Sequence, residues 1–340
     1  MNCKILTILL ATLISAEALR AADVVTISSG KDGRGRLRLT GEILDYQGDG
    51  LTFRHATGRE EILPVEKIVQ LDSPLNAKHT AADELLRQGK FTDALSLYRE
   101  AANAEQRAWM TRRIFASSVR CYQQLQQFDR AGEMFLGLYR KDPQTPHFDA
   151  IPLTWSRIDA NTQLQQRARA WLKDPSPAAK LMGASWLLSL GDQTGVLDVL
   201  TQVTEQQDAK LAQLAAAQIW RLRLVQVTRD ETDKWQAKID KMPQSLRAGP
   251  YYMLGLALAR LDQPEAAALA FMRVPILFPG QQDLAQDALL AAGKEFEKLS
   301  QTDAAATAYR ELLANAGESP RATEAASRLK LLGTQGAKSE

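Results

Sequence analysis

The spacing of hydrophobic residues divides the chain into two parts, each with its own period. From residue 22 to 74, apolar and polar residues alternate in short runs such as RLRLTGEILDYQ and GLTFRHAT, separated by glycine-containing turns. Alternation with a period of two is typical of half-buried β-strands, and such turns favour hairpins. From Asn76 onward, apolar residues recur every three or four positions, as in amphipathic helices. The sequence therefore predicts four or five short strands followed by a long series of helices.

The helical part contains a repeated unit. The stretch QGKFTDALSLYREAA, residues 88–102, has a glycine, then an alanine, then an aromatic residue four positions after that alanine. The same offsets give four pairs: Ala94 with Tyr98, Ala131 with Phe135, Ala267 with Phe271, and Ala305 with Tyr309. Twelve residues before each alanine stand Ala82, Val119, Gly255 and Gly293. Small residues let two helices cross closely, and the ring fills the space against the next helix.

This arrangement resembles the tetratricopeptide repeat. Pro143 and Pro279 follow the second and third copies at the same offset, as the family pattern requires. The alanine anchors are 37 residues apart in the first pair of copies and 38 in the second. The family unit is about 34 residues, so slightly longer helices or loops are implied. The resemblance implies an α-α solenoid, a TPR-like superhelix whose concave groove binds a protein or peptide.

The middle of the chain matches the unit less well. The tripeptide AKL at 179–181 recurs at 209–211, and we interpret the surrounding helices as degenerate tetratricopeptide or HEAT-type hairpins. Ala131 and Ala267 are 136 residues apart, four times 34, which favours a continuous solenoid; a break into two arrays is the alternative. The expected organisation is a signal peptide at 1–21, a small β module at 22–74, TPR-like hairpins at 75–145, degenerate hairpins at 146–246, TPR-like hairpins at 247–332 and a disordered tail at 333–340.

The β module resembles Sm-like or SH3-like barrels. The stretch GEILDYQGDGLTFRHATGREEILPVEKIVQLD gives strand, Gly-Asp-Gly turn, strand, turn, strand, proline and a short last strand. The resemblance covers this segment alone and implies a small N-terminal β-barrel or curled β-sheet. The expected fold class is thus mainly α, with the solenoid preceded by this β module.

The N-terminus predicts export. Lys4 precedes an apolar run of twelve residues, 5–16, and small residues follow at Ala18, Ala21 and Ala22. This is the pattern of a secretory signal peptide, and the run is short for a membrane-spanning helix. We expect a periplasmic or secreted protein with no stable membrane insertion after cleavage; an uncleaved anchor or a buried helix is the alternative. After cleavage Cys121 is the single cysteine, so it is expected to be a buried structural thiol.

Composition and motifs point away from catalysis and nucleic acid. The formal net charge is +2, without the basic excess that nucleic acid or anionic lipid would require. His55, His79 and His147 do not stand at metal-ligand spacing, and no nucleophile-elbow, dinucleotide or P-loop motif occurs. We therefore expect a protein that is not an enzyme, with no catalytic residue, no metal and no cofactor.

The candidate binding surface is the groove formed by the first helix of each hairpin. Its predicted residues are Asn76, His79, Asp83 and Leu86 in the first copy, and Arg113, Arg120 and Gln123 in the second. The two arginines, seven residues apart, share a helix face and could receive a carboxylate; solvated arginines are the alternative.

The chain also resembles envelope tetratricopeptide proteins that organise outer-membrane assembly or wall-division machinery. The predicted function is therefore a non-catalytic exported scaffold or adaptor that binds a protein or peptide partner in the cell envelope. The alternatives are a binding module for cell-wall glycan or another envelope polymer, and an enzyme with an unrecognised site.

Overall fold

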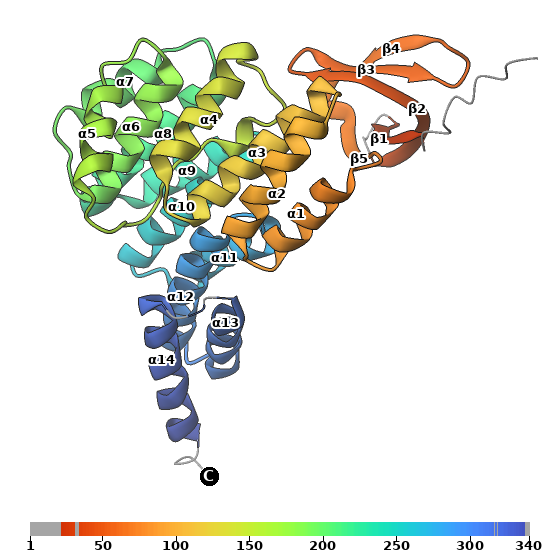
Figure 1. Ribbon diagram of the computed structural model, residues 1–340. Coiled ribbons are helices and arrows are strands. Elements are labelled where there is room, and N and C mark those ends of the chain that lie inside the picture. The colour runs from red at the N-terminus through yellow and green to blue at the C-terminus, as the bar shows by residue number, and fades with distance from the viewer. Residues whose placement is uncertain (1–21, 31–33, 316, 318, 337–340) are drawn as a thin grey trace, which may run out of the picture.

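The chain folds into a small antiparallel sheet followed by a long array of helices (Figure 1). The computed structural model describes residues 22–30, 34–315, 317 and 319–336. The predicted signal peptide and residues 337–340 of the predicted tail lie outside the described residues. Residues 333–336 of that tail belong to the last helix instead. That helix is held by Leu329 and Leu332, which pack into the last apolar cluster of the array.

The N-terminal sheet has five antiparallel strands in the order β4-β3-β2-β1-β5. The strands are β1 (Asp23–Ser29), β2 (Gly35–Gln47), β3 (Gly50–His55), β4 (Glu60–Leu63) and β5 (Ile68–Asp72), with a 3-10 turn η1 (Val65–Lys67) before β5. The long strand β2 pairs with β1 through its first half and with β3 through its second half. In the described strands β4 and β5 form the two edges and do not pair with each other. The module is therefore a curled sheet, and the closed barrel that was the other expectation is not formed.

The described part of the helical array contains fourteen α-helices and three 3-10 turns. The helices are α1 (Ala77–Arg87), α2 (Phe91–Ala104), α3 (Ala108–Gln124), α4 (Phe128–Lys141), α5 (Thr162–Trp171), α6 (Pro177–Leu190), α7 (Val196–Thr204), α8 (Ala209–Arg223), α9 (Arg229–Asp240), α10 (Ala248–Arg260), α11 (Pro264–Leu277), α12 (Gln282–Lys298), α13 (Thr302–Asn315) and α14 (Pro320–Gly336). The turns are η2 (Phe148–Ala150), η3 (Leu224–Gln226) and η4 (Gln244–Leu246). Most helices adjacent in sequence pack against each other, and contacts of α4 with α6 and of α8 with α10 continue the packing through the irregular middle. In Figure 1, α12–α14 extend away from the rest of the array.

The repeat positions lie where close packing requires them. None of the four alanines of the second helices has any exposed surface, and the four aromatic rings are at most 1% exposed. A Cβ atom on Gly255 would lie 2.5 Å from the ring of Phe271, and one on Gly293 would lie 2.3 Å from the ring of Tyr309. The aromatic residue of the second helix therefore packs directly on the backbone of the first. This is the interlocking that the tetratricopeptide pattern predicts.

The turn inside each hairpin has one geometry despite four different residues. Gly89, Gln126, Asp262 and Ser300 all have a left-handed φ, between 54° and 73°. After each of them, the next backbone N–H returns to the carbonyl five residues earlier, as when Gln301 N donates to Phe296 O at 2.9 Å. This is the Schellman ending of a helix, which glycine adopts without steric cost. Because the other three residues adopt it too, at a cost of roughly 1 kcal/mol each, the hairpin packing must impose the turn.

The β module docks on α3, the first helix of the second hairpin. Trp109 and Met110 of α3 are buried in one cluster with Ile43, Phe53 and other sheet residues. The Trp109 indole Nε1 donates a hydrogen bond to Ile43 O at 3.1 Å. The large ring of Trp109 finds its apolar surroundings in the sheet, and this explains why docking occurs at the second hairpin.

Candidate functional site

The α1 residues predicted to face the groove serve largely to build the first hairpin. Asn76 is the N-cap of α1, and its Oδ1 accepts a hydrogen bond from His79 N at 2.8 Å. The His79 side chain is fully buried beside the Tyr98 ring, and burial lowers its pKa. Asp83 accepts a hydrogen bond from the Tyr98 hydroxyl at 2.6 Å, and Leu86 is partly buried against the same cluster. His79 is therefore a core residue and not a surface one, because its ring fills the space next to Tyr98.

The α3 residues lie closer to open space. Arg113 is partly buried, and Arg120 Nη2 forms an ion pair with Asp149 Oδ2 at 2.8 Å. Arg113 and Arg120 both act on His147, whose pKa falls to about 4 chiefly through burial and further through these positive charges. Gln123 and Arg120 line an open polar cleft. Of the seven residues predicted to form the binding groove, Arg120 and Gln123 are the two that line this cleft.

An extended segment of the chain itself, residues 151–160, lies against α6 and α8. Thr154 N donates to Ser185 Oγ and Ser185 Oγ donates to Thr154 O, both at 2.9 Å. The Thr154 hydroxyl donates to Ser185 O at 3.0 Å, and Trp186 Nε1 donates to Pro152 O at 2.8 Å. Side chains of α6 thus bind the backbone of an extended segment. This surface of α6 and α8 is therefore occupied by the chain's own residues.

Arg221 of α8 completes this network. Its Nη1 donates to Thr154 O at 3.0 Å and to Ser185 O at 3.2 Å, and its Nη2 donates to Ser189 Oγ at 2.8 Å. Burial lowers the pKa of the guanidinium to about 10. Within the described residues it has no carboxylate partner, so neutral oxygens alone stabilise its charge. The carbonyl of Thr154 is therefore held in place by a buried cation.

A polar cleft of about 770 Å³ lies beside this segment. Its walls come from the α1–α2 turn, the α3–α4 turn, the extended segment, the start of α12 and the start of α14. Carboxamide side chains dominate the lining: Gln88, Gln123, Gln124, Gln126, Gln281, Gln282 and Gln286. Phe91, Phe128 and Trp155 add aromatic surface. The cleft therefore joins the N-terminal and C-terminal hairpins, which are about 200 residues apart in the sequence.

Charged groups line the C-terminal wall of the polar cleft. Arg321 Nε lies 2.6 Å from Asp287 Oδ1, and Arg321 Nη1 lies 3.3 Å from Asp283 Oδ1. Burial raises the pKa of both carboxyl groups, and the positive charge of Arg321 opposes that rise. Ser156 of the extended segment also opposes the rise in the pKa of Asp287. This wall is fixed by ion pairs, whereas the amides opposite it supply both donors and acceptors.

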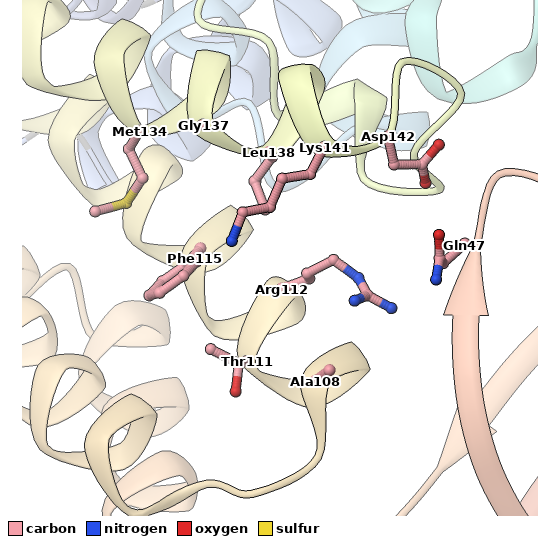
Figure 2. A pocket seen from close by; sticks show the side chains of 10 residues that line it. All are labelled: Gln47, Ala108, Thr111, Arg112, Phe115, Met134, Gly137, Leu138, Lys141 and Asp142. Carbon is pink, nitrogen blue, oxygen red and sulfur yellow. The ribbon is translucent and has the colours of Figure 1, made fainter.

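A second cavity of about 420 Å³ lies between the β2–β3 hairpin, α3 and α4 (Figure 2). Phe115, Met134 and Leu138 give it an apolar floor, and Lys141 and Arg112 reach into it. Arg112 Nη2 is held by Asp45 and donates to Tyr46 O at 3.0 Å. This apolar cleft is separate from the polar cleft and shares no lining residue with it.

The sequence pattern did not reveal the extended segment. Residues 151–160 have neither helical nor strand periodicity, and the signal available was the density of prolines around them, at Pro143, Pro146 and Pro152. His147, which no motif singled out, has a buried Nε2 without a hydrogen-bond partner. Cys121 is buried and unpaired, and burial raises its pKa to about 12. This thiol therefore stays protonated at neutral pH.

Within the described residues, no cluster of three or more His, Cys, Asp or Glu side chains is arranged to hold a metal ion. Among the helices of the described part, none combines the length and apolar character needed to cross a bilayer.

Comparisons with known proteins find similarity in solved structures. No protein-family profile matches the chain, and no curated protein sequence matches it significantly. The C-terminal part of a TPR repeat-containing protein from Cytophaga hutchinsonii aligns at 13% identity and a TM-score of 0.25, covering 73% of this chain and 98% of that one. The TPR2AB domain of yeast Sti1, in a complex with pHSP90, aligns at 11% identity and a TM-score of 0.23, covering 75% of this chain and 95% of that one. At these scores the description of the fold depends on the chain's own hairpins, which have tetratricopeptide-like packing and turns.

Proposed function

We propose that this protein is a non-catalytic scaffold that binds an extended segment of a partner protein in the polar cleft. The observation that carries the proposal is the amide-rich lining of that cleft, contributed by hairpins from both ends of the array. Carboxamides donate and accept hydrogen bonds, and so match the alternating N–H and C=O groups of an extended peptide. The aromatic side chains beside them offer apolar surface for a partner's side chains.

The chain's own segment supports this mode of recognition. Ser185 and Arg221 bind the backbone of residue 154 without contacting a charged side chain of the segment. An array that holds its own extended residues in this way has the chemistry to hold a second extended chain next to them. Of the residues predicted from the sequence, Arg120 and Gln123 are those we assign to partner binding. Arg113 remains a proposed contributor from the same helix.

We further infer that the protein acts outside the cytoplasm, in the periplasm or as a secreted protein. Support comes from Lys4 and the short apolar run after it, which have the features of a cleaved export signal. The partner would then be a protein of envelope assembly or of the cell-wall machinery. N-terminal sequencing of the protein recovered from the cell envelope tests the export part of the proposal. A sequence that starts at residue 1 or 2 would contradict cleavage.

Photocrosslinking tests the binding site. We expect Gln123→p-benzoylphenylalanine and Gln282→p-benzoylphenylalanine variants, expressed in the native cell and irradiated, to give the same crosslinked protein from opposite walls of the cleft. The matched control is the same replacement at Gln207, which is exposed and does not line the cleft. Mass spectrometry then identifies the crosslinked segment.

Two outcomes would contradict the proposed function. Equal crosslinking at residue 207 would mean non-specific contact. Crosslinks to wall polymer, together with co-sedimentation of the purified protein with cell-wall glycan, would mean that the ligand is a polymer and not a protein. A purified partner peptide should also lose affinity for a Gln123→Trp variant, because the indole would fill the cleft, whereas Gln207→Trp should bind normally.

A further inference from the structure

The apolar cleft between α3 and α4 has the size and lining of a small-molecule site. Its volume of about 420 Å³ falls in the range of ligand pockets, about 300–1,000 Å³. Phe115, Met134 and Leu138 form its apolar floor, and Figure 2 shows these side chains on α3 and α4. Gly137 lies on the same wall, and a Cβ atom placed on it would have no atom within 4 Å. Among the described residues, no side chain therefore occupies the space next to Gly137, and the apolar floor is open to a ligand there.

Of the two cationic side chains at this cleft, Arg112 forms an ion pair and Lys141 forms none with the described residues. Arg112 is neutralised by Asp45 of strand β2. Asp142 points away from the floor and accepts hydrogen bonds from Gly48 N at 2.8 Å and Gln144 N at 3.1 Å. Lys141 reaches over the floor in Figure 2 and forms no ion pair within the described part of the chain. The mouth of the cleft thus presents one ammonium group whose charge is not balanced by a salt bridge.

We propose that the cleft binds a monomeric fatty acid, with its acyl chain on Phe115, Met134 and Leu138 and its carboxylate at Lys141. An acyl chain suits this floor because it brings no N–H or C=O group that would need a partner there. A peptide would bring both, and the floor offers no polar atom to satisfy them. One apolar chain with one acidic headgroup matches one apolar floor with one unpaired ammonium. The site does not depend on the polar cleft or on its partner.

Calorimetric titration of the full purified chain with decanoate, below its micelle concentration, tests the proposal. We expect saturable binding with one decanoate per chain. Decyltrimethylammonium has the same chain length and the opposite charge, and it should bind at least about tenfold more weakly. Lys141→Gln should weaken decanoate binding about two- to fivefold, as expected for a solvent-exposed ion pair. The exposed Lys238→Gln on α9 is the matched control and should leave the affinity unchanged.

A second pair of variants tests the position of the chain. Gly137→Leu places a side chain in the cleft and should weaken decanoate binding about tenfold or more. It should fold, because leucine is a better helix former than glycine and its Cβ meets no atom. Gly333→Leu on α14, also free of close contacts, should bind decanoate as the wild type does. The proposal is overturned by absence of saturable binding, by equal affinity for both headgroups, or by unchanged affinity in Gly137→Leu.

Discussion

At the scale of single residues, His147 shows how the two modules share one electrostatic environment. Its ring stands edge-on to the ring of Tyr46 in β2, with centroids 6.2 Å apart. Asp149 of η2 favours the protonated ring, while Arg112, Arg113 and Arg120 of α3 oppose it. Burial is the largest cause of the low pKa, and the arginines reinforce it. The imidazole is therefore neutral at physiological pH, wedged between the sheet and the helices.

We predict that acidification destabilises the fold through His147. The folded-state pKa of about 4 lies below the ordinary value of 6.5, so between these two pH values the unfolded chain binds a proton that the native chain does not. The free energy of unfolding should therefore fall as pH falls, by about 2 kcal/mol from pH 7.5 to pH 5. Urea unfolding at several pH values measures this. His147→Phe keeps a ring against Tyr46, and the fall of about 2 kcal/mol should be absent in this variant. If its free energy of unfolding depends on pH as in the wild type, other groups cause the dependence.

At the scale of helices and hairpins, the sequence allowed the packing to be predicted more fully than the site. Alanine and aromatic spacing depends on local helix geometry, so the buried positions could be identified from the period alone, Tyr98 and Tyr309 among them. The burial of His79 could not, because it depends on a ring in the neighbouring helix. The extended segment was also unpredictable, since Thr154 is fixed by Ser185 and Arg221, which lie 31 and 67 residues further along the chain. Contacts at that separation leave no periodic signal.

The hydrogen bonds of the extended segment should contribute measurably to stability. Thr154→Val keeps the shape of the side chain but removes the hydroxyl that donates to Ser185 O and accepts from Ser189 Oγ at 2.9 Å. We expect the free energy of unfolding to fall by about 1–3 kcal/mol, because buried oxygens lose their donor and acceptor. Thr201→Val on the exposed face of α7 makes the same chemical change and should cost less than about 0.5 kcal/mol. Similar losses for both variants in thermal or urea unfolding would mean that the segment is not anchored at Thr154.

At the scale of the whole molecule, the sheet and the array are joined by a few strong contacts. Trp109 is 1% exposed at the centre of the joint. At its edges, Gly48 N donates to Asp142 Oδ2 at 2.8 Å and Arg107 Nη1 donates to Ser73 Oγ at 2.8 Å. Docking at the second hairpin brings the β2–β3 loop against the end of α4, which creates the apolar cleft of Figure 2. Trp109 and these hydrogen bonds together hold the module where Gln47 completes the lining of that cleft.

Removing this ring should release the β module. Trp109→Ala should cost about 3–5 kcal/mol and leave a cavity between the sheet and α3. We expect limited proteolysis of this variant to cut the linker near residues 73–76, giving a helical core that lacks the sheet. Trp235→Ala is the control, since that indole stacks on Trp220 at 4.7 Å in the middle of the array, far from the joint in sequence. If both variants are cut at the linker at the same rate, general destabilisation and not docking explains the cleavage.

The last hairpins have a mechanical consequence. The apolar cluster of α13 and α14 reaches the earlier helices through α12 and through Met272 of α11, and Figure 1 shows α13 and α14 projecting from the body. A force applied near residue 336 would act on α14 first and then on α13. The helices before α13 would carry little of that force until α14 and α13 had detached. The molecule would thus lengthen in steps from its C-terminal end. Because the start of α14 also forms one wall of the polar cleft, tension on this end would open that wall before it disturbed the opposite one.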